Sequence, residues 1–284
     1  MRIAVISDTH LAPEAQVFNA NARAALRWIE ATAPDLVVHL GDVTVDGAFH
    51  PDEMDYAHDL FAGIGPPMRW LPGNHDIGNP PCVPQSASES LFNPGILQRF
   101  RTALGEDYWS VETEGWQILG LNAQLFGLDD AEEQAQFDWI ERALNGSHAK
   151  LGVMLHKPLF RDGPSDAERH QRYLPLDARH RLTALWTHRD LRFVMAGHTH
   201  QLRSIVVEGT EHIWAPSSAY FIPDAVQERI GRKEVGVLLL ELGPEAHTWS
   251  FVVPDGVQKN DLTDFADIYP EIAERLAHKA ASVP

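Results

Sequence analysis

Short apolar runs alternate with longer amphipathic stretches over the first quarter of this chain. The apolar runs at residues 2–7, 35–40 and 67–71 have the length and continuous apolar character of buried strands. Between them, residues 19–32 carry apolar side chains at helical spacing and begin at an asparagine that can cap a helix, and a second helix is expected near residues 52–62. This β-α-β-α-β order predicts right-handed crossovers and a parallel sheet.

The remaining chain repeats strand and helix patterns without an internal repeat or a linker. Residues 108–112 and 116–122 predict a hairpin, and residues 132–144 predict an amphipathic helix. Further strands are expected at residues 151–155, 191–196, 213–215, 235–242 and 248–253. Two β-rich halves flanked by helices predict an α/β fold, a four-layer α-β-β-α sandwich of two mixed sheets.

We expect one domain over residues 1–254, followed by a C-terminal arm over residues 255–284 with a helix near 267–281. The arm would pack on the body of the domain or on a neighbouring chain, which would make a homo-oligomer. Residues 79–107 are rich in Pro, Ser and Asn, with one helix near 96–104. Because long irregular segments are often functional, this one is expected either to wall a substrate pocket or to be a solvated connector.

Composition narrows the class of protein. The net charge of −17 argues against binding long nucleic acid, which requires a basic surface. No apolar stretch approaches the roughly 18–20 residues that span a bilayer, and no leader pattern precedes the first strand. A single cysteine, Cys82, excludes an internal disulfide. These features predict a cytoplasmic enzyme without a membrane partner.

Five polar motifs follow the apolar runs, four of them directly and one two residues later. Because the carboxyl ends of strands in one sheet converge, we expect the motifs to form a single polar cleft at that edge. The motifs are Asp8-Thr9-His10, Gly41-Asp42, Gly73-Asn74-His75-Asp76, His156 and Gly197-His198-Thr199-His200.

The donor atoms of these motifs indicate a catalytic metal site. Two carboxylates, one amide oxygen and four imidazoles, with no cysteine nearby, suit Mn, Fe, Zn, Co or Ni and disfavour a structural zinc site. Two ions about 3.5–4 Å apart need a bridging carboxylate, for which Asp42 is the natural candidate. With only two carboxylates the site keeps a net positive charge for a phosphate.

The combination D-x-H, GD, GNHD, H and GHxH, spanning residues 7–200, resembles the calcineurin-like metallophosphoesterase superfamily. It is most similar to the bacterial cyclic-nucleotide and glycerophosphodiester branch. The resemblance implies two divalent or trivalent ions of Mn, Fe, Zn or Co, a metal-bridging hydroxide that attacks phosphorus, and a catalytic role for His75. It further implies that one ion is held by Asp8, His10, Asp42 and His200, and the other by Asp42, Asn74, His156 and His198.

Three departures from relatives shape the expected substrate. Protein Ser/Thr phosphatases carry GDxVDRG at the second motif, whereas this chain has no arginine there and has Val45 in place of the aspartate that orients the histidine. Lys157 follows His156 and would either add positive charge near the substrate or point to solvent. We therefore expect hydrolysis of small phosphodiesters (cyclic nucleotides, glycerophosphodiesters or aryl diesters). The alternatives are a phosphomonoesterase on nucleotides or sugar phosphates, and a non-catalytic scaffold, which the complete motif set disfavours.

Overall fold

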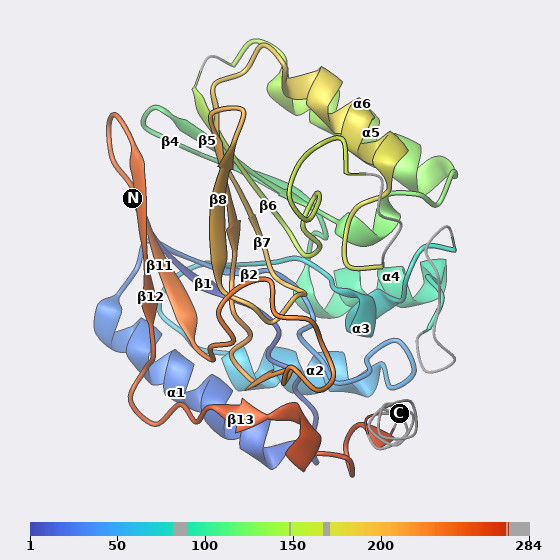
Figure 1. Ribbon diagram of the computed structural model, residues 1–284, viewed down its shortest axis with the longest axis vertical. Helices are drawn as coiled ribbons and strands as arrows, with labels where there is room; N and C mark the ends of the chain where they lie inside the picture. The colour runs from blue at the N-terminus through green and yellow to red at the C-terminus, as the bar shows by residue number, and fades with distance from the viewer. Residues whose placement is uncertain (82–89, 148, 167–170, 271, 273–284) are drawn as a thin grey trace, which may run out of the picture.

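Two β-sheets pack face to face, and helices cover the outer side of each (Figure 1). The computed structural model describes residues 1–81, 90–147, 149–166, 171–270 and 272. Both sheets combine parallel and antiparallel pairs. The predicted four-layer α-β-β-α sandwich of two mixed sheets is therefore confirmed.

The first sheet has the strand order β12-β11-β1-β2-β3. Its parallel part is the predicted β-α-β-α-β unit, in which helices α1 (Gln16–Thr32) and α2 (Asp52–Phe61) connect the strands. Two later strands add to its edge in antiparallel fashion. The strands are β1 (Arg2–Ile6), β2 (Leu36–His39), β3 (Met68–Trp70), β11 (Val237–Leu242) and β12 (His247–Val252).

The second sheet has the order β4-β5-β6-β7-β9-β8, with the predicted hairpin at one edge. Helices α5 (Ala131–Leu144) and α6 (Leu176–Trp186) lie on its outer face (Figure 1). The strands are β4 (Trp109–Thr113), β5 (Trp116–Leu121), β6 (Lys150–Leu155), β7 (Leu191–Ala196), β8 (Arg203–Val207) and β9 (Thr210–Trp214). The shorter elements are α3 (Asn74–Ile77), α4 (Pro94–Leu104), η1 (Ala123–Leu125), η2 (Leu262–Asp264), and the paired strands β10 (Tyr220–Phe221) and β13 (Asn260–Asp261).

Successive side chains of β1 point to opposite faces of the first sheet and so enter two different layers of the core. Ile3 and Val5 pack between the sheets with Met154 of β6, whereas Ala4 and Ile6 face the helices of the first sheet. This is the period of two that a strand requires when both of its faces are buried. Burial on both faces fixes the register of each strand, and the register sets the position of the polar motif that follows the strand.

Helix α1 begins at Gln16, three residues earlier than expected, so Asn19 does not cap it. Asn19 is buried inside the helix, where its Nδ2 donates to the carbonyl of Ala12 and to the Tyr56 hydroxyl, at 2.8 and 2.9 Å. A tertiary contact therefore uses the side chain that the sequence pattern assigned to a cap.

The described part of the C-terminal arm packs against the body of the domain. Leu262, Tyr269 and Ile272 share an apolar cluster with Phe18 and Tyr220. Most of the helix expected at 267–281 falls outside the described residues, as do Cys82 and the middle of the 79–107 segment. Packing of the arm on a neighbouring chain stays a prediction. None of the described helices is both long and apolar enough to cross a bilayer.

Candidate metal centre

The five motifs emerge from both sheets, not from one as expected. Asp8, Asp42 and Asn74 follow β1, β2 and β3 of the first sheet, whereas His156 and the Gly197–His200 motif follow β6 and β7 of the second. The two groups are joined directly, because the backbone N–H of His198 donates to both carboxylate oxygens of Asp8 at 3.2 and 3.1 Å. The carboxyl edges of the two sheets thus meet in one site.

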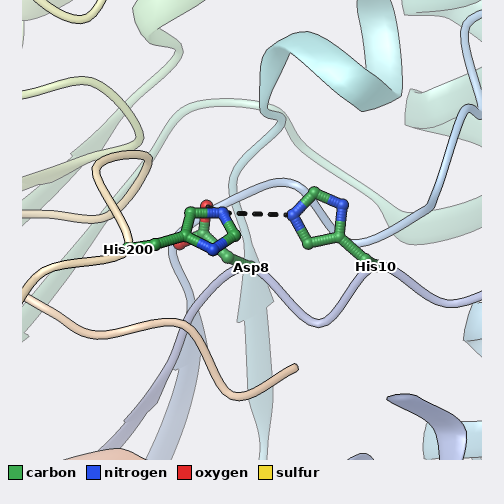
Figure 2. Close-up of side chains that lie close together, drawn as sticks. All are labelled: Asp8, His10 and His200. Atoms are coloured by element: carbon green, nitrogen blue, oxygen red, sulfur yellow. Dashed lines mark hydrogen bonds and ion pairs between the residues drawn. The ribbon is translucent and has the colours of Figure 1, made fainter. Parts of the chain in front are cut away.

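Asp8, His10 and His200 form one cluster of potential ligand atoms (Figure 2). Nε2 of His200 lies 3.3 Å from Oδ1 of Asp8 and 3.3 Å from Nε2 of His10. All three side chains are buried, so these atoms face one another without competition from bulk water.

Asp42, His156 and His198 form a second cluster, and Asn74 joins it. Nε2 of His156 lies 3.2 Å from Oδ2 of Asp42, 3.1 Å from Nδ1 of His198 and 3.3 Å from Oδ1 of Asn74. The structure therefore brings together all seven side chains that the sequence assigned to metal binding.

The chemistry of both clusters fits a transition metal. Donors bound to one ion at about 2.0–2.1 Å lie about 3.0–3.4 Å apart, and the separations of 3.1–3.3 Å fall in that range. Imidazole nitrogens with carboxylate and amide oxygens are the mixed set that Mn, Fe, Zn and Co accept. The residues present therefore fit a dinuclear centre.

His75 lies beside the second cluster without belonging to it. Its backbone N–H donates to Oδ1 of Asp42 at 2.9 Å, and its ring stands edge-on to that of His10 with centroids 4.9 Å apart. Its Nδ1–H donates to the carbonyl of Val45 at 2.7 Å. The orienting partner that the sequence could not supply is thus the main chain of the residue that replaces the expected aspartate.

The local backbone is strained at five of the seven candidate ligands. The values of φ are 52° for Asp8, 46° for His10, 49° for Asp42, 66° for His198 and 52° for His200. Residues other than glycine rarely adopt this left-handed backbone conformation, and such outliers concentrate at functional sites. The conformation turns each side chain out of the strand direction and towards the common centre.

Glycines before the ligands permit close approach of the loops. A methyl group on Gly73 would overlap with Oδ1 and the backbone nitrogen of Asp42, and one on Gly197 would overlap with the Ser7 hydroxyl. Only a residue without Cβ fits at either place. The glycine that precedes Asn74 and the glycine that precedes His198 are therefore required for close packing around Asp42 and Ser7.

Asp76 joins the second and third motifs. Its Oδ2 accepts hydrogen bonds from the N–H groups of Val43 and Gly73 at 3.1 and 2.8 Å. Its Oδ1 accepts from the N–H and the hydroxyl of Thr44 at 2.9 and 2.7 Å. The carboxylate is fully buried and thereby fixes the loop of Asp42 against that of Asn74 and His75.

Burial and charge act in opposite directions on the ionisable groups. Burial dominates at His10 and His198 and lowers their pKa well below the ordinary value, so both are neutral and able to bind an ion. At His75 and His156 burial also acts to lower the pKa, but the negative charge of Asp42 and a hydrogen bond, to the Val45 carbonyl at His75 and to Asp42 at His156, act together with other nearby carboxylates to raise both values. Burial would raise the pKa of Asp42, yet His156 and His75 hold it well below its usual range.

The pocket over the clusters includes residues that the motifs did not reveal. It is lined by Asp42, Asn74, His75, His198 and His200 together with Gln171, Arg172, Tyr220, Ile222, Val226, Gln227, Leu262, Tyr269 and Ile272. Tyr220 and Tyr269 also contact His10 through their hydroxyl groups, at 3.3 and 2.7 Å. Neither tyrosine lies in a motif, so residue type and spacing gave no signal for them.

Two expectations about neighbouring segments have different outcomes. Lys157 does not point to solvent, because it is 1% exposed and its Nζ donates to Oδ1 of Asn79 at 2.5 Å. The expected role of the 79–107 segment as a pocket wall stays a prediction, since residues 82–89 lie outside the described part. Among the described residues of that segment, 94–104 form α4, which packs against α2 and α3.

Two bacterial proteins are similar to this chain in sequence. The chain is 28% identical over 232 residues to the 3',5'-cyclic adenosine monophosphate phosphodiesterase CpdA of Escherichia coli, which covers 77% of this chain and 76% of that protein. It is 27% identical over 209 residues to a probable cyclic nucleotide phosphodiesterase of Synechococcus sp., covering 71% and 74% of the two chains.

A solved structure shows the same fold. A dimetal phosphatase from Danio rerio superposes with a TM-score of 0.59 at 13% identity, over 88% of this chain and 95% of that one. Residues 1–202, which include all five motifs, match the sequence model of the family described as calcineurin-like phosphoesterase. On the motifs, the fold and this match, the chain belongs to the calcineurin-like phosphoesterase family.

Proposed function

We propose that this phosphoesterase hydrolyses small phosphodiesters, and that cyclic nucleotides are the first substrates to test. The observation that carries the proposal is one pocket that is lined by His75 and by members of both nitrogen and oxygen donor clusters. The names of the Escherichia coli and Synechococcus relatives support the choice of cyclic nucleotides. Glycerophosphodiesters and aryl diesters belong to the same chemical class.

In this proposal Asp42 serves both clusters. Asp8, His10, Asp42 and His200 would hold one ion, and Asp42, Asn74, His156 and His198 would hold the other, drawn from Mn, Fe, Zn or Co. Bound ions supply positive charge for the phosphate oxygens and lower the pKa of water. The seven side chains contribute only two negative charges, so the loaded site attracts a phosphodiester even though the chain carries a net charge of −17.

His75 is proposed as the residue that acts on the leaving group. Its Nδ1–H is fixed by the carbonyl of Val45, which leaves Nε2 for the substrate. Nε2 of His75 is thereby placed to stabilise the phosphoryl oxygens or to donate a proton to the departing oxygen. Its partial exposure, unlike the complete burial of His10, is consistent with contact to substrate.

The pocket is small and partly apolar. Its volume is about 140 Å³; Ile222, Val226 and Leu262 line one part of it, and Arg172 contributes positive charge. A small diester presents one negative charge on phosphorus and an organic group on each side, which suits this combination. We also propose that residues 1–254 form the catalytic domain and that the described part of the arm completes this apolar wall through Leu262 and Ile272.

A parallel assay tests the substrate class. Bis(4-nitrophenyl) phosphate, 4-nitrophenyl phosphate and cyclic AMP are compared with Mn²⁺ added. We expect a higher kcat/KM for the aryl diester than for the aryl monoester, together with measurable hydrolysis of cyclic AMP. A strong preference for the monoester would replace the proposal by the phosphomonoesterase alternative.

Ligand variants test the metal centre independently of the substrate. Asp42→Ala and Asn74→Ala should abolish turnover and reduce the bound metal measured by elemental analysis, because each removes a donor atom. Asp59→Ala is the matched control, since that carboxylate is 84% exposed on α2. Full metal content in either ligand variant would refute the assignment.

A further inference from the structure

The imidazoles around the metal centre differ in what holds their second nitrogen. An imidazole that binds an ion through one nitrogen carries its proton on the other, and the partner of that N–H fixes the tautomer and the ring orientation. Nδ1 of His156 faces the carbonyl of Leu40 at 3.0 Å, and Nδ1 of His200 faces the carbonyl of Tyr220 at 3.1 Å. Both of these partners belong to the main chain.

His10 is held by a side chain instead. Its Nε2 faces Nε2 of His200, on the side where the ion would lie, and its Nδ1 lies 2.7 Å from the hydroxyl of Tyr269. The hydroxyl of Tyr220 is 3.3 Å from Nε2 of His10, so it lies on the ion side and cannot fix the opposite nitrogen. With Nε2 directed at an ion, Nδ1–H of His10 donates to the oxygen of Tyr269.

Tyr269 is well placed to keep this contact. It is 5% exposed, and its ring packs near Phe18 and Tyr220, with centroid distances of 6.4 and 5.7 Å. Leu262 and Ile272 of the arm belong to the same apolar cluster. The arm is thus anchored on both sides of Tyr269 by packing that does not involve the metal ligands.

We propose that Tyr269 of the C-terminal arm is a positioning residue for His10, through which the arm sets the affinity of one of the two metal sites. The inference rests on the ligand role proposed above for His10. Tyr269 lies beyond residues 1–202, the part of the chain that matches the family, so it adds to the family's motif set a contribution from this chain's own C-terminal arm.

A metal titration of the full chain tests this without any substrate. Mn²⁺ is added to metal-free protein, and electron paramagnetic resonance measures the free ion, which gives two macroscopic affinities. Tyr269→Phe keeps the ring and its packing but removes the acceptor oxygen. We expect one affinity to fall about tenfold and the other to stay unchanged, because loss of a hydrogen-bonding partner of a metal-binding histidine costs roughly 10–100-fold.

The matched control is Tyr56→Phe. The Tyr56 hydroxyl likewise meets a buried side chain, since Asn19 donates to it at 2.9 Å, but Tyr56 lies on α2 and belongs neither to the donor clusters nor to the pocket lining. This variant should keep both affinities. Thermal unfolding of the metal-free variants reports whether either substitution disturbs the fold.

A double-mutant cycle with His10→Ala identifies the route of the effect. If Tyr269 acts through His10, then Tyr269→Phe has no further effect on metal binding once His10 is absent. Unchanged affinities in Tyr269→Phe, equal losses at both sites, or a further loss in the His10→Ala background would each overturn the proposal. A wild-type chain that binds two Mn²⁺ ions yet hydrolyses no phosphodiester would refute the proposed function and leave this comparison valid.

Discussion

Asp76 offers a sharp test of how the second and third motifs are held together. Its carboxylate accepts four hydrogen bonds, two on each oxygen, three of them from backbone N–H groups. Asparagine at this position keeps the shape but replaces one acceptor oxygen by an N–H₂ donor. The change therefore keeps the packing, and it removes the buried charge together with one acceptor.

The expected cost follows from which partners can adapt. The amide oxygen can take the place of Oδ2 and accept from Val43 and Gly73. The amide nitrogen then faces Thr44, whose hydroxyl can accept from it, whereas the Thr44 N–H loses its partner. One buried unsatisfied N–H costs about 1–3 kcal/mol. At pH 8 this loss is offset by removal of the buried charge, because burial and the charge of Asp42 raise the pKa of Asp76 from 3.8 to about 6, so Asp76→Asn should stay within about 1 kcal/mol of the wild type. Asp76→Ala removes the same charge but leaves all four donors without their acceptor, so it should be less stable than Asp76→Asn by about 2 kcal/mol or more.

Urea unfolding of the metal-free protein at pH 8, followed by tryptophan fluorescence, measures both values. Asp59→Asn is the control and should be neutral, because that carboxylate is exposed. Turnover of Asp76→Asn should fall by at least about tenfold, since small displacements of catalytic groups cost up to about 100-fold. Equal stability of Asp76→Asn and Asp76→Ala would refute the hydrogen-bond reasoning, because the two variants lose the same charge and differ in their hydrogen bonds.

Three further perturbations have expected outcomes. His75→Ala should keep the bound metal but cut turnover by about 10²–10⁴-fold, measured by elemental analysis and an aryl diester assay; loss of metal would make His75 a structural residue. Gly73→Ala should cost about 1–3 kcal/mol of stability and weaken Mn²⁺ binding, because the added methyl group would overlap with Asp42. Gly65→Ala is the control, since a methyl group there meets no atom within 4 Å. Equal stability and equal Mn²⁺ affinity of the two variants would contradict the steric argument. Burial raises the pKa of Glu53 from 4.5 to about 7, so the folded state holds the proton more tightly than the unfolded state, and this stabilisation is lost as pH rises from 4.5 to 7. Glu53→Gln should therefore raise the free energy of unfolding by about 2 kcal/mol at pH 8 and leave it nearly unchanged at pH 4.5, and chemical denaturation that shows the same effect at both pH values would exclude this cause.

The sequence predicted the features that depend on local pattern. Strand runs such as 2–7 and 151–155 are continuous apolar segments, and the polar residue at the end of each run is displayed at the sheet edge in the structure. Helix α4 ends at Leu104 as expected, and it begins at Pro94 behind an Asn93 cap. Where burial on both faces dictates the residue types, the pattern was sufficient.

Features set by contacts distant in the sequence could not be predicted in this way. Helix α6 has the sequence LDARHRLTALW, in which charged residues interrupt the apolar face. One of them, Arg179, is buried and donates a hydrogen bond to the carbonyl of Asp166. The Val45 carbonyl that orients His75 carries no residue-type signal at all. Tyr269 and His10 are 259 residues apart, and only the folded chain shows that they meet.

The left-handed backbone of the candidate ligand residues makes the stability of the protein depend on a bound ion. At about 1 kcal/mol each, five such residues store about 5 kcal/mol, a sum comparable to the net stability of an ordinary domain. The candidate ligands are distributed from Asp8 to His200, so an unfolded chain cannot gather them. An ion that binds at the proposed centre would therefore bind only the folded chain and stabilise it by mass action. In a cell short of metal, newly made chains would therefore unfold and be degraded by proteases more often than metal-loaded chains. The amount of this enzyme would then depend on the supply of the ion.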